Sequence, residues 1–117
     1  MSKFNGVKTD NAKVIQKIDF RNFALENIDD AAVLEIYCGA GEMYRRVWKK
    51  APYYMGIDRK KFFDERNVII GDAMKALMTI DVSRFNIIDI DAYGSPYDVM
   101  NYISEVFSGS QLTLVVS

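Results

Sequence analysis

The 117-residue sequence contains no histidine and only one cysteine, and these two shortages remove most catalytic and metal-binding chemistries. Ser/His/Asp triads, Cys/His dyads and Cys/His zinc sites need side chains that this chain lacks. We therefore expect no metal site, and a protein of a reducing compartment, the cytoplasm. The chain also has no apolar run near the roughly 20 residues that span a bilayer, and residues 1–10 lack a signal-peptide core. We expect no membrane association.

The chain is also poor in proline, with two residues, and contains no linker, repeat or low-complexity tract, so we expect a single domain over residues 1–117. The formal net charge of −1 hides an uneven distribution along the chain. Residues 45–66 hold eight basic and three acidic side chains, whereas residues 67–117 hold two and six. The basic block is either a solvated surface or a patch for a phosphate-bearing substrate.

Short apolar runs alternate with segments of helical periodicity. The predicted strands, too continuous for half-exposed ones, are Val33–Tyr37, Tyr53–Ile57, Asn67–Ile70, Phe85–Ile90 and Leu112–Val116. The predicted helices are Asp10–Asn27, which an Asp cap opens, Glu42–Lys50, Lys60–Asp64, Ala73–Thr79 and Tyr97–Phe107. This alternation predicts an α/β fold with a Rossmann-like, doubly wound parallel sheet of five strands in the order 3-2-1-4-5. Ligands of such sheets bind beyond the carboxyl ends of the strands.

Three predicted strands end in residues suited to a nucleotide-like ligand. The first runs into Cys38-Gly39-Ala40-Gly41, a turn that lets backbone N–H groups approach a ligand closely or merely connects strand to helix. The bulky Tyr44 stands where a dinucleotide-binding motif has its third glycine, which argues against NAD. Asp58 ends the second strand, where a carboxylate can accept hydrogen bonds from two ribose hydroxyls or cap a helix. Asp72 follows the third strand and could cap the next helix and accept from an adenine amine.

The ordered segments VLEIYCGAGEM, YYMGIDRK and NVIIGDA resemble the first three motifs of class I S-adenosylmethionine-dependent methyltransferases. The resemblance extends over residues 33 to about 100 and implies a cofactor site for S-adenosylmethionine at the strand ends. It implies that Glu35 and the Cys38–Gly41 backbone hold the methionine part, Asp58 the ribose, and Asp72 with Ala73 the adenine. The implied cofactor-binding set is Glu35, Cys38, Gly39, Ala40, Gly41, Asp58, Arg59, Asp72, Ala73 and Asp89.

The fourth strand ends in DIDAYGSP, which is similar to a segment of tRNA guanine-N2 methyltransferases and, more distantly, to the [DN]PP[YF] segment of other amino-group methyltransferases. The resemblance implies two catalytic residues, Asp91 to orient an exocyclic amine and Tyr93 to stack on the base. It favours guanine N2 of RNA, above all tRNA, as the methyl acceptor. Ala92 departs from the family pattern, which has a proline whose fixed φ stiffens the loop.

Other interpretations remain open. Cys38 also matches the first motif of pyrimidine C5 methyltransferases, but their nucleophile lies at or beyond the fourth strand, so we expect Cys38 to pack against the cofactor. Ala92 and the absence of further strands favour a truncated or degenerate module that binds S-adenosylmethionine or its product without catalysis. The acidic, aromatic DIDAY segment could also bind the amine of a small-molecule or protein substrate. Methyltransferases of this class continue through two further C-terminal strands, so we expect a truncated or minimal domain. Its apolar fifth strand would then pair with a second copy or be covered by a missing segment.

Overall fold

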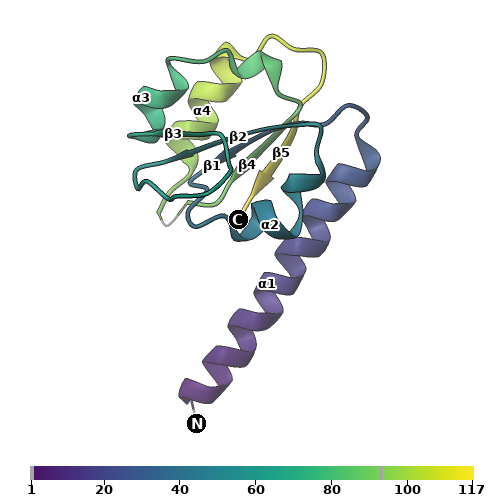
Figure 1. The fold of residues 1–117 in the computed structure, drawn as a ribbon, viewed down its shortest axis with the longest axis vertical. Helices are drawn as coiled ribbons and strands as arrows, with labels where there is room; N and C mark the ends of the chain where they lie inside the picture. Colours follow the sequence, from purple (N-terminus) through teal and green to yellow (C-terminus); the bar gives the residue numbers. More distant parts are fainter. Residues whose placement is uncertain (1, 93) are drawn as a thin grey trace.

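The computed structural model describes residues 2–92 and 94–117, with side chains from Lys13 onward. Five parallel strands form one sheet in the order β3-β2-β1-β4-β5, which confirms the predicted Rossmann-like α/β fold and its strand order (Figure 1). The strands are β1 (Ala32–Ile36), β2 (Tyr53–Asp58), β3 (Val68–Ile70), β4 (Ile87–Ile90) and β5 (Thr113–Val116). The order reverses direction between β1 and β4, and ligands of open α/β sheets bind at such a point.

Helices cover both faces of the sheet (Figure 1). One face carries α1 (Ser2–Asn27), α2 (Glu42–Arg46) and the short 3-10 helix η1 (Trp48–Lys50), and the other carries α3 (Ala73–Leu77), the 3-10 helix η2 (Val82–Arg84) and α4 (Tyr97–Val106). Because successive strand residues point to opposite faces, Leu34 and Ile36 pack with α3 and α4, whereas Val33 packs with Trp48. The N-terminal half of α1 projects beyond the sheet (Figure 1).

Three predicted helices differ from the observed ones. The first begins at Ser2, so Asp10 lies inside α1 and does not cap it. The second is interrupted at Val47, whose backbone leaves the helical region (φ −134°, ψ −65°) and separates α2 from η1. No helix forms at Lys60–Asp64, because the Asp64 carboxylate accepts hydrogen bonds from the backbone N–H and the guanidinium of Arg66, which hold a turn in place of a helix.

The prediction that every strand is buried on both faces holds for β1 and β4 and is wrong for β2 and for the two edge strands, β3 and β5. All four residues of β4 and all but the first of β1 are buried. On the edge strands, Ile70 and Val116 remain 46% and 42% exposed, because an edge strand has a neighbour on one side only. Among the described residues, no helix is both long enough and apolar enough to cross a membrane.

Candidate functional site

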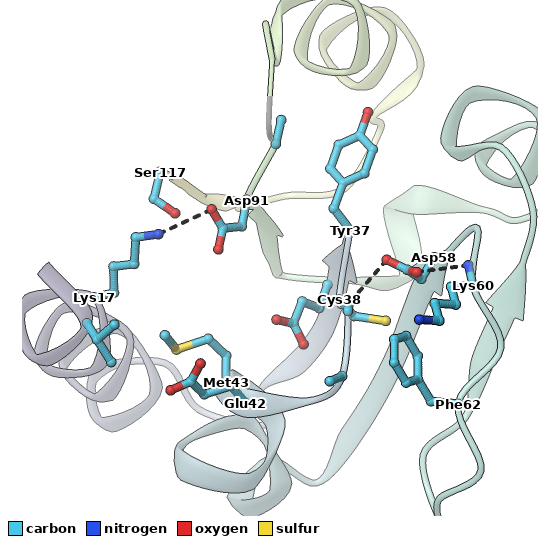
Figure 2. Close-up of a pocket in the computed structure, with 15 residues that line it drawn as sticks. Lys17, Tyr37, Cys38, Glu42, Met43, Asp58, Lys60, Phe62, Asp91 and Ser117 are labelled. Carbon is cyan, nitrogen blue, oxygen red and sulfur yellow. Dashed lines mark hydrogen bonds and ion pairs between the residues drawn. The ribbon is translucent and has the colours of Figure 1, made fainter. Parts of the chain in front are cut away.

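The carboxyl ends of β1, β2 and β4 open into one cavity of about 840 Å³ (Figure 2). Its wall comes from α1, the turn after β1, the start of α2, the segments after β2 and β4, and the end of β5. The lining residues are Val14, Lys17, Glu35, Tyr37, Cys38, Gly39, Ala40, Glu42, Met43, Asp58, Lys60, Phe62, Asp91, Ala92 and Ser117. The cavity thus lies at the predicted position, beyond the carboxyl ends of parallel strands.

The turn after β1 depends on backbone conformations that favour glycine. Gly39 and Gly41 have φ values of +55° and +91°, in the left-handed region. A Cβ atom on Gly41 would also lie 2.9 Å from the guanidinium carbon of Arg66, so any other residue there would displace the end of the Arg66 side chain. Gly39 and Ala40 line the cavity, whereas Gly41 lies behind it against Arg66.

Asp58 ties this turn to the segment after β2. One carboxylate oxygen accepts a hydrogen bond from the Gly39 N–H at 3.1 Å, and the other accepts from the Lys60 N–H at 2.9 Å. Each carboxylate oxygen can accept more than one hydrogen bond, so Asp58 retains capacity for hydroxyl donors from the cavity. Its position fits the predicted ribose role, and the tie between the two segments is a second role that the spacing did not reveal.

A second cavity of about 390 Å³ shares Tyr37, Asp58 and Ala92 with the first. Three residues of the predicted cofactor-binding set, Arg59, Asp72 and Ala73, also line it. The remaining lining residues are Met74 of α3 and two residues of the turn after β4, Gly94 and Ser95. The Asp72 carboxylate caps α3 by accepting from the Lys75 N–H at 3.1 Å, as predicted, and also accepts from Arg59 at 3.0 Å. These two partners lower the pKa of Asp72, the cap hydrogen bond being the larger cause.

Glu35 is a buried carboxyl group in the wall of the main cavity. Its side chain is 2% exposed, and one oxygen accepts a hydrogen bond from the Tyr54 hydroxyl at 2.7 Å. Burial, and then the charge of Asp89, raise the pKa of Glu35 to about 8, so the group is mostly protonated at neutral pH. Tyr54 was missed as a site residue because its pairing with Glu35 depends on the register between β1 and β2.

Cys38 lines the cavity near Asp58 (Figure 2). It is 5% exposed, and burial, with a further contribution from Glu35, raises the pKa of its thiol to about 11. A neutral thiol is a poor nucleophile. Cys38 therefore acts as a small packing residue in the wall, in line with its expected position.

Asp89 does not line either cavity, although the resemblance placed it in the cofactor site. Its side chain is fully buried and accepts hydrogen bonds from Arg21 at 2.7 and 2.8 Å and from the Trp48 indole at 2.9 Å. Arg21 is itself 1% exposed. This arrangement gives Asp89 a structural role, which sequence reasoning missed because Arg21 lies 68 residues away.

Asp91 lies in the main cavity opposite α1, where the Lys17 ammonium is 3.4 Å from its carboxylate (Figure 2). Both side chains are about one-third exposed, so the pair faces the solvent of the cavity. Lys17 was not among the predicted site residues, because nothing in the sequence shows which face of a helix turns to a distant strand end. The other predicted catalytic residue, Tyr93, lies outside the described residues.

The structure therefore brings Glu35, Cys38, Gly39, Asp58 and Asp91 together at one cavity and places Arg59, Asp72 and Ala73 at the adjoining one. Comparisons with known proteins return no match, whether with protein-family models, with curated proteins or with solved structures.

Proposed function

We propose that this chain is an S-adenosylmethionine-dependent methyltransferase that methylates an exocyclic amino group of a nucleic-acid base, with guanine N2 of RNA favoured. One observation carries the proposal: Glu35, the glycine turn, Asp58 and Asp91 line a single cavity at the carboxyl ends of β1, β2 and β4. Asp72 adds an acceptor in the adjoining cavity. The two volumes are in the range of ligand sites, roughly 300–1,000 Å³.

The chemical groups in the cavities suit the cofactor. Asp58 offers acceptors for a ribose diol, and the Asp72 carboxylate has unused lone pairs for an adenine amine. Burial raises the pKa of Glu35, and the ammonium group of the cofactor's methionine part would lower it again. Glu35 would then be ionised and paired with this ammonium group. When bound, S-adenosylmethionine supplies a methyl group already activated by its sulfonium.

With the methyl group activated by the cofactor, the residues mainly position the acceptor. The Asp91 carboxylate accepts a hydrogen bond from the exocyclic amine, which directs the nitrogen lone pair away from the carboxylate and toward the methyl donor. The same carboxylate can take up the proton released when the nitrogen acquires the methyl group. The Lys17 ammonium contacts one Asp91 oxygen at 3.4 Å, and because each carboxylate oxygen can accept more than one hydrogen bond, the acceptor amine can bind beside it.

The test combines binding with transfer. In calorimetry, S-adenosylmethionine and its demethylated product should bind the wild type, and Asp58→Asn should weaken binding about 10- to 100-fold, as expected for lost hydrogen bonds to a charged group. Asp98→Asn, an exposed carboxylate of α4, is the matched control and should bind as the wild type does. Binding of NAD, or of neither ligand at millimolar concentration, would contradict the proposal. Thermal melts exclude unfolding of the variants.

Transfer of labelled methyl groups into total RNA, DNA and protein fractions identifies the acceptor. Label should enter RNA, tRNA above all, and Asp91→Asn should abolish this transfer while cofactor affinity stays within about three-fold, since Asp91 touches the acceptor. Label in protein or in small molecules alone would assign a different acceptor. Equal loss of cofactor binding and transfer would assign Asp91 to the cofactor.

A second candidate function is a module that binds S-adenosylmethionine or its product without catalysis. Two observations favour it: the Lys17 ammonium already pairs with Asp91, the predicted acceptor of the substrate amine, and Ala92 stands where the segments that this one resembles have proline. Binding without transfer to any fraction would support this candidate. Either function would operate in the cytoplasm.

A further inference from the structure

The segment between β2 and β3, residues 59–67, combines positive charge with an aromatic side chain that is turned to solvent. It carries the sequence RKKFFDERN, and Phe63 within it is 91% exposed, more than any other large apolar side chain described. Its neighbour Phe62 is partly buried and lines the main cavity together with Lys60 (Figure 2). The segment therefore forms part of the rim of the candidate site. We call residues 59–67 the rim loop.

Arg66 holds the rim loop in place. Its side chain is 2% exposed, donates two hydrogen bonds to the Asp64 carboxylate at 2.9 and 2.8 Å, and lies 5.7 Å from the centre of the Phe62 ring. It also packs against Gly41, where a Cβ atom would lie 2.9 Å from the guanidinium carbon. These contacts hold the turn that follows the Phe62–Phe63 pair and the Phe62 ring itself. Phe63 is thus presented to solvent by an ordered loop, which lowers the entropic cost of binding through it.

The cations of the rim loop fall into two groups. The guanidinium groups of Arg59 and Arg66 are paired with Asp72 and Asp64. Lys60 and Lys61 make no ion pair with any residue that the structure describes, and their ammonium groups lie 5.5 and 5.2 Å from the ring centres of Phe62 and Phe63. Two ammonium groups that face solvent beside aromatic rings are free to bind a polyanion.

We propose that the rim loop binds single-stranded RNA, with Phe63 stacked on an unpaired base and Lys60 and Lys61 on the adjacent phosphates. Single-stranded nucleic-acid sites combine these two elements, because every base has a face that stacks on an aromatic ring and every nucleotide carries a negative charge. The position at the cavity rim would hold a strand next to Asp91. That the bound RNA carries the methyl acceptor rests on the proposed function. The binding of RNA to the rim loop does not require the cofactor.

Two other partners are less well matched. A membrane surface is bound by an amphipathic helix or an extended apolar patch, whereas the rim loop offers one fully exposed ring on an irregular segment. A protein partner would need a contiguous apolar surface, and the aromatic neighbour Phe62 is turned toward the cavity (Figure 2). These partners enter the test as alternative ligands.

The experiment measures fluorescence anisotropy of a labelled single-stranded RNA of twelve nucleotides and mixed sequence, titrated with the full chain without cofactor. Phe63→Ala should weaken binding about 5- to 150-fold, the range for loss of one stacked base. The matched control is Phe23→Ala, because Phe23 is an exposed ring on α1 (67%) away from the rim loop. It should leave RNA affinity unchanged.

The charge contribution is read from salt dependence. The double variant Lys60→Gln/Lys61→Gln should flatten the plot of log affinity against log salt by about 1.4, two phosphates of a single strand. The control pair, Lys13→Gln/Lys75→Gln, removes the same charge from exposed lysines elsewhere and should leave the slope as in the wild type.

Each outcome decides the inference separately from the proposed function. The inference is overturned if the wild type does not bind the RNA at millimolar concentration, or if Phe63→Ala and Phe23→Ala behave alike. It is also overturned if polyglutamate or anionic phosphatidylserine vesicles bind with the same dependence on Phe63 and RNA does not. Failure of S-adenosylmethionine binding with RNA binding intact would instead reject the methyltransferase proposal and leave the rim loop as an RNA site.

Discussion

Glu35 shows how a single residue couples the fold to the chemistry of the cavity. A carboxyl group that is 2% exposed loses its hydration, and the hydrogen bond from the Tyr54 hydroxyl is a weak compensation for a full negative charge. The protein therefore keeps Glu35 protonated at neutral pH, with a pKa raised to about 8. A cationic ligand group in the cavity would favour its ionised form, so the residue is able to respond to ligand charge.

The raised pKa has a consequence for stability. Glu35 takes up its proton near pH 4.5 in the unfolded chain and near pH 8 in the folded one. Between these values the folded protein binds the proton that the unfolded chain has lost. The free energy of unfolding therefore falls as pH rises through this window, by up to about 1.4 kcal/mol per pH unit, and levels off above it.

Glu35→Gln removes this titration and keeps an acceptor for Tyr54. We expect the variant to gain stability relative to the wild type between pH 5 and pH 9, by on the order of 3 to 5 kcal/mol. Urea unfolding followed by circular dichroism at several pH values measures the difference. Glu105→Gln, an exposed carboxyl group of α4, is the control. A difference between Glu35→Gln and wild type that does not change with pH would show that Glu35 is ionised throughout.

At this scale the sequence predicted the candidate acidic residues and missed their partners. Asp58, Asp72 and Asp91 each end or follow a strand, and Glu35 lies within one, features that can be read from the chain. Tyr54, Arg21, Lys17 and Arg66 acquire their roles from strand register and helix packing, which join residues 19 to 74 positions apart or turn a loop inward. Asp89 was assigned to the cofactor for the same reason, because the sequence does not show that Arg21 and Trp48 bind its side chain in the core.

Among the elements, α1 and η1 are joined to the sheet by one buried polar cluster. Asp89 of β4 accepts from Arg21 of α1 and from Trp48 of η1, and Arg21 also donates to the Ser117 hydroxyl at 3.0 Å. Replacing such a pair by apolar residues is often neutral, whereas removing one partner leaves a buried charge uncompensated. The cluster thereby fixes α1 in the one position that places Lys17 at the cavity.

Asp89→Asn should lower the free energy of unfolding by about 3 to 5 kcal/mol, because the Arg21 guanidinium stays buried without its counter-charge. Urea unfolding followed by circular dichroism measures the loss. The control, Glu42→Gln, breaks the exposed pair with Arg46 at 3.6 Å and should cost less than about 1 kcal/mol. Adding Arg21→Met to Asp89→Asn should recover part of the loss; a further loss would contradict an electrostatic origin.

The strands were predicted better than the helices. A parallel sheet buries continuous apolar runs, and in the sequence these runs are flanked by glycine and charged residues. The short helices were predicted less well. Val47 interrupts the helical pattern of residues 42–50 to let Trp48 reach Asp89, and the Asp64 side chain replaces a helix after β2. Both changes serve contacts with distant residues, so local periodicity could not reveal them.

For the whole molecule, the two edges of the sheet differ in what lies beside them. β3 ends one edge with Ile70 exposed, and β5 ends the other with Val116 exposed. The N–H groups of Thr113 and Ser117 donate to the carbonyls of Asn86, just before β4, and of Ile90 in β4. The alternation of the strand therefore turns the N–H groups of Leu114 and Val116 outward. Beside β5, α1 adds the exposed rings of Phe20 and Phe23, which border a groove that also contains Leu112. The β5 edge therefore combines outward backbone groups with the apolar groove beside α1.

We expect two copies of the chain to pair through their β5 edges, since outward N–H and C=O groups beside apolar side chains form a template for another strand. Val116→Lys adds a charge to this edge and should shift the protein to a monomer. Ile70→Lys makes the same change on β3, at a residue of similar exposure, and should leave the assembly as in the wild type. Sedimentation equilibrium over a hundred-fold range of concentration measures the state. A wild type that stays monomeric over this range, or a dimer that Ile70→Lys disrupts and Val116→Lys does not, would show that β5 is not the pairing edge.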